Sequence, residues 1–254
     1  MFSLIKLDII NCIKNKKFTI VFFIFFSLSF LHFLFVSLYI LKDTSAITLF
    51  SSDLSLVEQY IGGDLFNLYI ILIPFTVNFI FSDSFSNEYS SNIHSNLIVR
   101  KGLKSYVYSK AIVTFLTTFL TIFLTLYINK LLIGLLSLGV STSIEHSYST
   151  HTHAYNYSSS LIIIVNSIIA SLISLTTLVI TIYFKHIKPI IIFVIISSIF
   201  FFSSIILGIF NMDSFNLYYY QQGVFDPKIA LPLLTIWLSL LFILLKVKIK
   251  NYVD

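Results

Sequence analysis

Long apolar runs separated by short polar segments dominate the chain. A helix that crosses the hydrocarbon core of a bilayer needs about 20 mostly apolar residues. Six segments reach or approach this length: residues 18–41, 66–82, 111–129, 161–184, 190–210 and 230–246. The second and the last of these segments are short. The pattern predicts an all-α integral membrane protein with six transmembrane helices in a single transmembrane domain over residues 1–254.

The composition agrees with a lipid environment. Hydrophobic residues make up 57% of the chain and charged residues only 11%, whereas soluble domains carry about 25% charged residues. A proportion of 11% is too low to cover the surface of a water-soluble fold of this size. The single cysteine, Cys12, excludes an internal disulfide and a clustered thiol metal site.

The distribution of charge predicts an orientation. If residues 1–17, 83–110, 185–189 and 246–254 face the cytoplasm, that side holds thirteen of the sixteen basic residues. The opposite side then holds seven of the eleven acidic residues. Basic residues collect on the cytoplasmic side of membrane proteins. The chain is therefore expected in the inner or plasma membrane of a bacterial cell, with both termini in the cytoplasm. This topology accounts for the net charge of +5 without a nucleic-acid partner.

The first seventeen residues have their own pattern. Apolar residues recur at helical spacing, and polar residues lie on the other side of the same helix. The apolar positions are Phe2, Ile5, Ile9 and Ile13, and the polar positions are Asp8, Asn11 and Lys14. This pattern predicts a short helix lying in the inner interface of the membrane over residues 1–17; the alternative is a solvated basic tail.

Two segments on the predicted outer side are rich in aromatic and apolar residues. They are residues 42–65 and residues 211–229. Tyrosine is enriched at the boundary between water and lipid, so both segments are expected to lie on the outer leaflet or dip into it. A segment that dips into the membrane must bury its backbone against protein, since lipid offers no hydrogen bonds.

The segment between the second and third spans is polar without the character of a disordered chain. Ser84 is a candidate N-cap for a short helix that carries Glu88 in its first turns. Gly102 is expected to end a helix or bend the chain at its position. The segment therefore predicts a short helix beneath the membrane, with a basic turn after it. Such a helix is suited to docking a soluble partner; the alternative is an ordinary connecting loop.

This segment resembles the first cytoplasmic loop of the ABC-2 type permease family, the membrane subunits of many bacterial ABC exporters. The residues that carry the resemblance are Asp83, Phe85, Glu88, Leu97, Arg100 and Lys110. The chain departs from the family at Asn92-Ile93, where Gly-Thr is frequent. The resemblance implies six spans, an N-terminal interfacial helix and a coupling helix that docks on an ABC ATPase subunit. The docking residues it implies are Asp83, Phe85, Glu88, Tyr89, Asn92 and Ile93, with a second contact at Lys185, His186 and Lys188.

An ATP site is not expected in this chain. The sequence has no phosphate-binding G-x-x-x-x-G-K-[ST] motif and only seven glycines. The resemblance therefore implies that ATP and Mg²⁺ are bound by the separate ATPase, and that this chain is a transport subunit without enzyme activity or cofactors. It also implies a second permease chain, and leaves open whether that chain is identical.

Polar residues are sparse within the predicted spans. Asn78, Asn166, Ser171 and Thr177 stand out. A polar face in lipid usually makes hydrogen bonds between helices, and we favour packing over the lining of a transport pathway. No carboxylate lies in the middle of a predicted span, which argues against an ion relay. Pro74 is expected to kink the second span.

Three histidines lie close together before the fourth predicted span. They are His146, His151 and His153, and imidazoles at this density can bind zinc or copper. The surrounding Ser, Thr, Tyr and Asn residues favour a solvated loop instead, because zinc sites need better-organised ligands.

The sequence leaves three hypotheses for function. The first is a permease subunit that is surrounded by membrane lipid and exports an amphipathic or hydrophobic substrate, such as a toxic peptide. The second is a stand-alone membrane immunity or sensor protein that binds peptides at its outer aromatic loops. The third is a membrane enzyme that uses the outer histidines.

Overall fold

A computed structural model describes residues 2–42, 63–91, 93–137, 159–210, 212–222 and 227–250. Every regular element in these ranges is a helix, and six helical segments are long and apolar enough to cross a membrane. The prediction of an all-α membrane protein with six spans is confirmed. The first three spans are α2 (Lys16–Lys42), the composite α3 (Gly63–Thr76) to α5 (Ser84–Ser90), and α7 (Leu103–Ser137). The last three are α8 (Ser159–Tyr183), α9 (Pro189–Ile209) and α11 (Pro227–Lys250).

The third span is much longer than the predicted 111–129. Helix α7 begins at Leu103 and includes Tyr106, Ser109 and Lys110, which are all buried. These polar residues precede the apolar run, so hydropathy alone begins the span too late. In the structure their partners come from other helices, and the helix continues through them.

The second span is interrupted near its middle. Pro74 lies inside α3, which ends at Thr76, and α4 (Asn78–Phe81) begins after Val77. Proline lacks an N–H and disturbs the helical ladder. The Pro74 carbonyl oxygen accepts hydrogen bonds from Asn78 Nδ2 at 2.9 Å and from Ser197 Oγ at 2.5 Å. The predicted disturbance at Pro74 is present, and side chains stabilise it.

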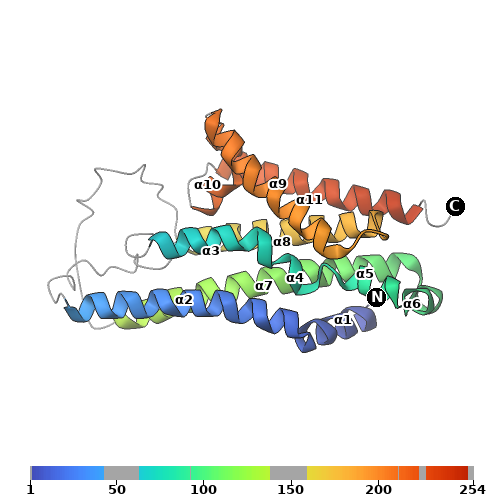
Figure 1. Ribbon diagram of the computed structural model, residues 1–254, viewed down its shortest axis with the longest axis horizontal. Coiled ribbons are helices and arrows are strands. Elements are labelled where there is room, and N and C mark those ends of the chain that lie inside the picture. The colour runs from blue at the N-terminus through green and yellow to red at the C-terminus, as the bar shows by residue number, and fades with distance from the viewer. Residues whose placement is uncertain are drawn as a thin grey trace.

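Helix α8 forms the centre of the bundle. It packs against α3, α7, α9, α10 and α11, and its apolar window is the most deeply buried of the six spans. Helices α2 and α7 lie side by side on one flank, and α9 and α11 lie on the other (Figure 1). The outward faces of α2, α9 and α11 are rich in exposed large apolar side chains, as expected for helices that contact lipid.

One end of the bundle collects the elements that carry most basic residues. It holds α1 (Phe2–Lys14), α5, α6 (Ile93–Lys101), the 184–188 connection and the C-terminal end of α11 (Figure 1). We call this the basic end. The first and last described helices therefore reach the same end of the bundle, as an even number of spans requires.

Helix α1 packs on the bundle with a different face from the predicted one. Its buried residues are Leu4, Asp8 and Cys12, whereas Phe2 is 90% exposed and Ile13 is also exposed. The prediction that Asp8 lies on the polar outer side is wrong. The cause is a specific partner, because the Asp8 carboxylate meets Lys110 of α7.

The segment after the second span forms two short helices, α5 and α6. The N-cap of α5 is Asp83 and not Ser84, and its side chain makes no capping hydrogen bond. Gly102 has φ of +79° and separates α6 from α7, so the prediction that it ends a helix is confirmed. This left-handed conformation costs glycine little.

Another pair of short elements comes after α9. They are the 3₁₀ turn η3 (Asp213–Phe215) and α10 (Leu217–Gln221). Asn216 Oδ1 accepts from Tyr218 N at 3.1 Å and so caps α10. Helix α10 packs on α8 and buries Tyr220 and Gln221, so this part of the 211–229 segment buries itself against protein. The other predicted outer segment, up to residue 62, lies outside the described residues.

Candidate functional site

A buried ion cluster at the basic end joins three helices. Lys110 of α7 donates to Asp8 Oδ1 of α1 at 2.7 Å and to Glu88 Oε1 of α5 at 2.5 Å. The Lys110 side chain is only 1% exposed. One ammonium group therefore holds the N-terminal helix and the short helix α5 against the third span.

The remaining carboxylate oxygens have their own donors. Tyr106 Oη donates to Glu88 Oε2 at 2.7 Å, and Ser109 Oγ donates to Asp8 Oδ2 at 3.0 Å. The Lys110 ammonium lies 5.0 Å from the centre of the Phe81 ring, which adds a cation–π contact. Buried charges are tolerated when they are paired and hydrogen-bonded in this way. We call Asp8, Glu88, Lys110, Tyr106 and Ser109 the ion cluster.

The cluster holds two carboxylates and one ammonium. Burial raises the pKa of Asp8 above its ordinary value of 3.8, and the nearby Glu88 charge raises it further. The Lys110 ammonium and the Ser109 hydroxyl act in the opposite direction but do not cancel the effect of burial. The charge of Asp8 is therefore held less firmly than that of an ordinary aspartate.

A second ion pair fixes the turn into α5. Lys17, at the start of α2, pairs with Asp83. Next to it, Phe85 is buried, and its ring lies 6.1 Å from Tyr106 and 6.3 Å from Tyr89 between centroids. The side chains of Asp83 and Phe85 thus anchor α5 to the bundle and are not available on its outer surface.

The outer surface of this end is formed by other residues. Asn87 and Ser90 of α5 are exposed, as are Ile93 and Val99 of α6, and Val99 is 86% exposed. Of the six residues predicted to dock a partner, Ile93 lies on this outer surface. Glu88 turns inward to Lys110 and Tyr106, and Asn92 lies outside the described residues. The docking role of α5 itself stays a prediction.

The predicted second contact adjoins the first. The His186 ring lies 6.2 Å from the Tyr89 ring in an edge-on arrangement, and Lys185 Nζ lies 5.1 Å from the centre of the Tyr89 ring. His186 and Lys188 are exposed. Tyr89 therefore joins α5 to the 184–188 connection, and the two predicted contacts form one surface.

The predicted polar positions within the spans contact other helices or their own helix. Asn78 Oδ1 accepts from Thr177 Oγ1 at 2.8 Å, which links α4 to α8. Asn166 Nδ2 donates to the carbonyl oxygen of Gln221 at 2.8 Å, which ties α8 to α10. Ser171 Oγ donates to the Ser167 carbonyl of its own helix. These contacts are those of helix packing, which is the interpretation that the sequence favours.

Two features of the site are not predicted from the sequence. The local pattern places Asp8 on the surface, and nothing in it marks the lysine 102 residues away that binds it. A stripe of buried threonines on α7 is the second feature, although its spacing of three or four residues is a visible signal. It consists of Thr114, Thr117, Thr118, Thr121 and Thr125. Four of these hydroxyls donate to carbonyls of α7 itself, which again indicates packing.

Metal ligands do not gather in the part of the chain that the structure describes, where no group of three His, Cys, Asp or Glu side chains suited to a metal ion occurs. His146, His151 and His153 lie outside that part, so the metal hypothesis for them stays a prediction.

The chain matches no protein-family model, no curated protein and no solved structure.

Proposed function

We propose that this chain is the membrane-spanning subunit of an ATP-driven exporter, of the kind that its resemblance to ABC-2 type permeases implies. The observation that carries the proposal is the ion cluster. It connects a short helix with an exposed outer face, α5, to a long membrane-spanning helix, α7, through one buried lysine.

The connection is stiff for an energetic reason. If α5 moved without α7, Glu88 would lose its contacts with Lys110 and Tyr106, and the buried lysine would keep Asp8 as its remaining carboxylate partner. A hydrogen bond to a charged group is typically worth about 1.5–3 kcal/mol, so this separation is unfavourable. A push or pull on α5 is therefore transmitted to α7 and, through Asp8, to α1. Transport subunits driven from outside need such a connection between their docking surface and their spans.

The proposed docking surface is the outer face of the basic end. It combines polar Asn87 and Ser90 with apolar Ile93 and Val99. Exposed apolar side chains among polar neighbours are typical of surfaces that bind another protein. The proposed partner is an ABC ATPase subunit, which binds ATP and Mg²⁺, and the functional unit includes a second permease chain.

The proposed substrate is amphipathic or hydrophobic, such as a toxic peptide. The polar groups of the spans are mostly engaged in hydrogen bonds within the bundle, so they do not line a hydrated path for ions. The proposed direction is outward, with the basic end in the cytoplasm of a bacterial cell.

Photo-crosslinking tests the proposed docking surface. A photoreactive amino acid is placed at Asn87 or Val99 in the full chain, expressed in its native membrane. The control position is Leu240, an exposed residue of α11. We expect adducts with a soluble ATPase subunit from positions 87 and 99 and none from position 240. The same subunit should co-purify with the chain in a fixed ratio.

The opposite result has a clear meaning. If the chain is stable and folded yet no ATPase is captured or co-purifies, the exporter proposal fails. The stand-alone immunity or sensor protein then becomes the better hypothesis, since it needs no ATPase.

A further inference from the structure

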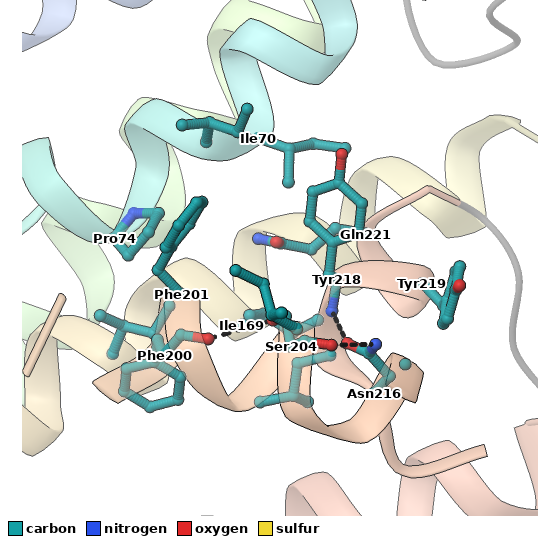
Figure 2. Close-up of a pocket in the computed structure, with 15 residues that line it drawn as sticks. Ile70, Pro74, Ile169, Phe200, Phe201, Ser204, Asn216, Tyr218, Tyr219 and Gln221 are labelled. Carbon is teal, nitrogen blue, oxygen red and sulfur yellow. Dashed lines mark hydrogen bonds between the residues drawn. The ribbon is translucent and has the colours of Figure 1, made fainter. Parts of the chain in front are cut away.

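A cavity of about 420 Å³ is built around α10, and α10 lies far along the bundle from α1 and α5, which contribute to the ion cluster (Figure 1). The cavity is lined by α3, α8, α9 and α10 with its N-cap Asn216 (Figure 2). Its volume falls within the range of about 300–1,000 Å³ that is usual for small-molecule sites. Pro74, Ile169 and Phe200 are among its apolar lining residues.

The cavity reaches the exposed apolar surface of α3 and α9. Three of the lining residues, Ile71 on α3 and Phe201 and Ile205 on α9, have exposed apolar side chains. Both helices belong to membrane spans. A molecule that enters here therefore comes from the hydrocarbon part of the membrane, and no described lining residue carries a charge that would attract an ionic group.

One polar group in the cavity has no partner among the described residues. Gln221 Nε2 is buried and makes no hydrogen bond to any of them, and the Gln221 side chain as a whole is only 5% exposed. In Figure 2 this side chain reaches toward the space between Phe201 and Tyr218. A buried donor without an acceptor is destabilising, and a ligand that supplies an acceptor removes this cost.

Two other polar side chains of the lining, Ser204 and Asn216, already have partners. Ser204 Oγ donates to the Phe200 carbonyl at 3.0 Å. Asn216 donates through Nδ2 to the Ser204 carbonyl at 2.9 Å and accepts through Oδ1 from Tyr218 N. Among the described lining residues, Gln221 Nε2 is thus the buried polar atom that still lacks a partner, and it lies in a mostly apolar chamber.

We propose that this cavity binds one acyl chain of a membrane lipid, with its ester carbonyl accepting a hydrogen bond from Gln221 Nε2. An ester carbonyl is an uncharged acceptor at the head of a long apolar chain, which matches one donor in a chamber that opens to lipid. A peptide fits less well, because each of its residues brings an N–H and a C=O that need partners in an apolar setting. This inference depends on the membrane-spanning fold and not on the proposed transport function.

The test uses the full chain in nanodiscs of phosphatidylcholine that carries a photoreactive diazirine on one acyl chain. After illumination, the modified residues are identified by mass spectrometry. We expect adducts on Ile169 and Ile173, which line the cavity on α8 and are buried, so that annular lipid does not reach them. Ile195, an exposed residue of α9, reports contact with bulk lipid.

Two variants change the site, and each has a matched control. A Cβ at Gly208, which lines the cavity, would meet no heavy atom within 4 Å, so a side chain can begin there without a clash and Gly208→Leu adds bulk to the lining. Gly134→Leu on α7 is its control, because that position is equally open. Gln221→Leu removes the donor, and Gln222→Leu, whose Nε2 bonds to Asn67 instead, is its control.

We expect Gly208→Leu to abolish the adducts on α8 and Gln221→Leu to lower them about two- to tenfold, the effect of one lost hydrogen bond. Adducts on Ile195 should stay constant, and both controls should behave as the unmodified chain. Adducts on exposed residues alone, or α8 adducts that neither variant reduces, would overturn the proposal. It would also be overturned if a photoreactive hydrophobic peptide labelled Ile169 while the lipid did not.

Discussion

Lys110 and Asp8 lie 102 positions apart in the sequence, yet their side chains meet at 2.7 Å in the interior of the protein. The same ammonium binds Glu88, 22 positions before it. Lys110 is thus the cation that the two carboxylates of the cluster share. Its removal should be far more damaging than the removal of either acid.

We expect Lys110→Met to lower the free energy of unfolding in detergent by about 3–5 kcal/mol, because it leaves two inward-facing carboxylates without their cation. Asp8→Asn should cost less, since the amide still accepts from Ser109 and Glu88 then has Lys110 to itself. Lys104→Met is the control, because Lys104 is exposed and surface changes usually stay within about 0.5 kcal/mol. Equal losses for Lys110→Met and Lys104→Met would refute the structural role of the cluster.

The pH dependence of stability should carry a signature of Asp8. Its pKa is raised in the folded protein by burial and by Glu88, so the folded state holds more protons than the unfolded state between 3.8 and that raised pKa. The stability that this group contributes is therefore fully present below the ordinary pKa of 3.8 and is lost as the pH rises through the folded pKa. The measurement compares thermal unfolding of the unmodified chain and of Asp8→Asn at several pH values. We expect the unmodified chain to gain stability relative to Asp8→Asn as the pH falls through this window; a difference that does not change with pH would contradict the assignment.

Cys12 reports whether α1 stays attached to the bundle. It is fully buried, and burial raises its pKa to about 11 from an ordinary 9.0. Its reactive thiolate fraction at neutral pH is therefore roughly a hundredfold smaller than that of an ordinary thiol. We expect maleimide to label Cys12 at least about a hundredfold more slowly than a cysteine at exposed Ser90, made as Ser90→Cys with Cys12→Ala. Lys110→Met should accelerate the labelling of Cys12, because it releases α1. If Cys12 of the unmodified chain were labelled as fast as the cysteine at position 90 of the variant, α1 would not be packed on the bundle.

Positive charge introduced at two positions of α5 should separate anchoring from docking. Glu88→Arg places a second cation against Lys110, so we expect it to reduce both thermal stability and the amount of ATPase that co-purifies. Ser90→Arg lies on the exposed side of α5 and should leave stability within about 0.5 kcal/mol while it reduces co-purification. If the unmodified chain co-purifies with an ATPase and Ser90→Arg does so to the same extent, α5 is not the docking element.

The fold is accessible from the sequence because its main determinant is local. A run of about 20 apolar residues specifies a span wherever it occurs. The basic and acidic residues of the connecting segments can likewise be counted from the sequence, without knowledge of distant contacts. The extension of α7 back through Lys110 to Leu103 and the buried face of α1 are not accessible, because each depends on a partner distant in sequence. Asp8 looks like a solvated residue until Lys110 is placed beside it, and Glu88 looks like a docking residue until Tyr106 and Lys110 turn it inward. The direction in which these side chains point therefore needs the three-dimensional structure.

The hydrogen bond from Thr177 Oγ1 to Asn78 Oδ1 tests how far polar packing stabilises the interrupted second span. Both residues are fully buried, and Asn78 also bonds to the Pro74 carbonyl. Thr177→Val keeps the shape of the side chain and removes the donor. Hydrogen bonds between membrane helices average about 0.6 kcal/mol and reach about 1.7 kcal/mol, and we expect a value toward the upper end, because Asn78 Oδ1 is left in an apolar interior. Thr235→Val is the control, since Thr235 is exposed and its hydroxyl bonds to its own helix at Pro232. The measurement is reversible unfolding in mixed micelles, and an equal effect of the two substitutions would show that the contact between α4 and α8 contributes nothing specific.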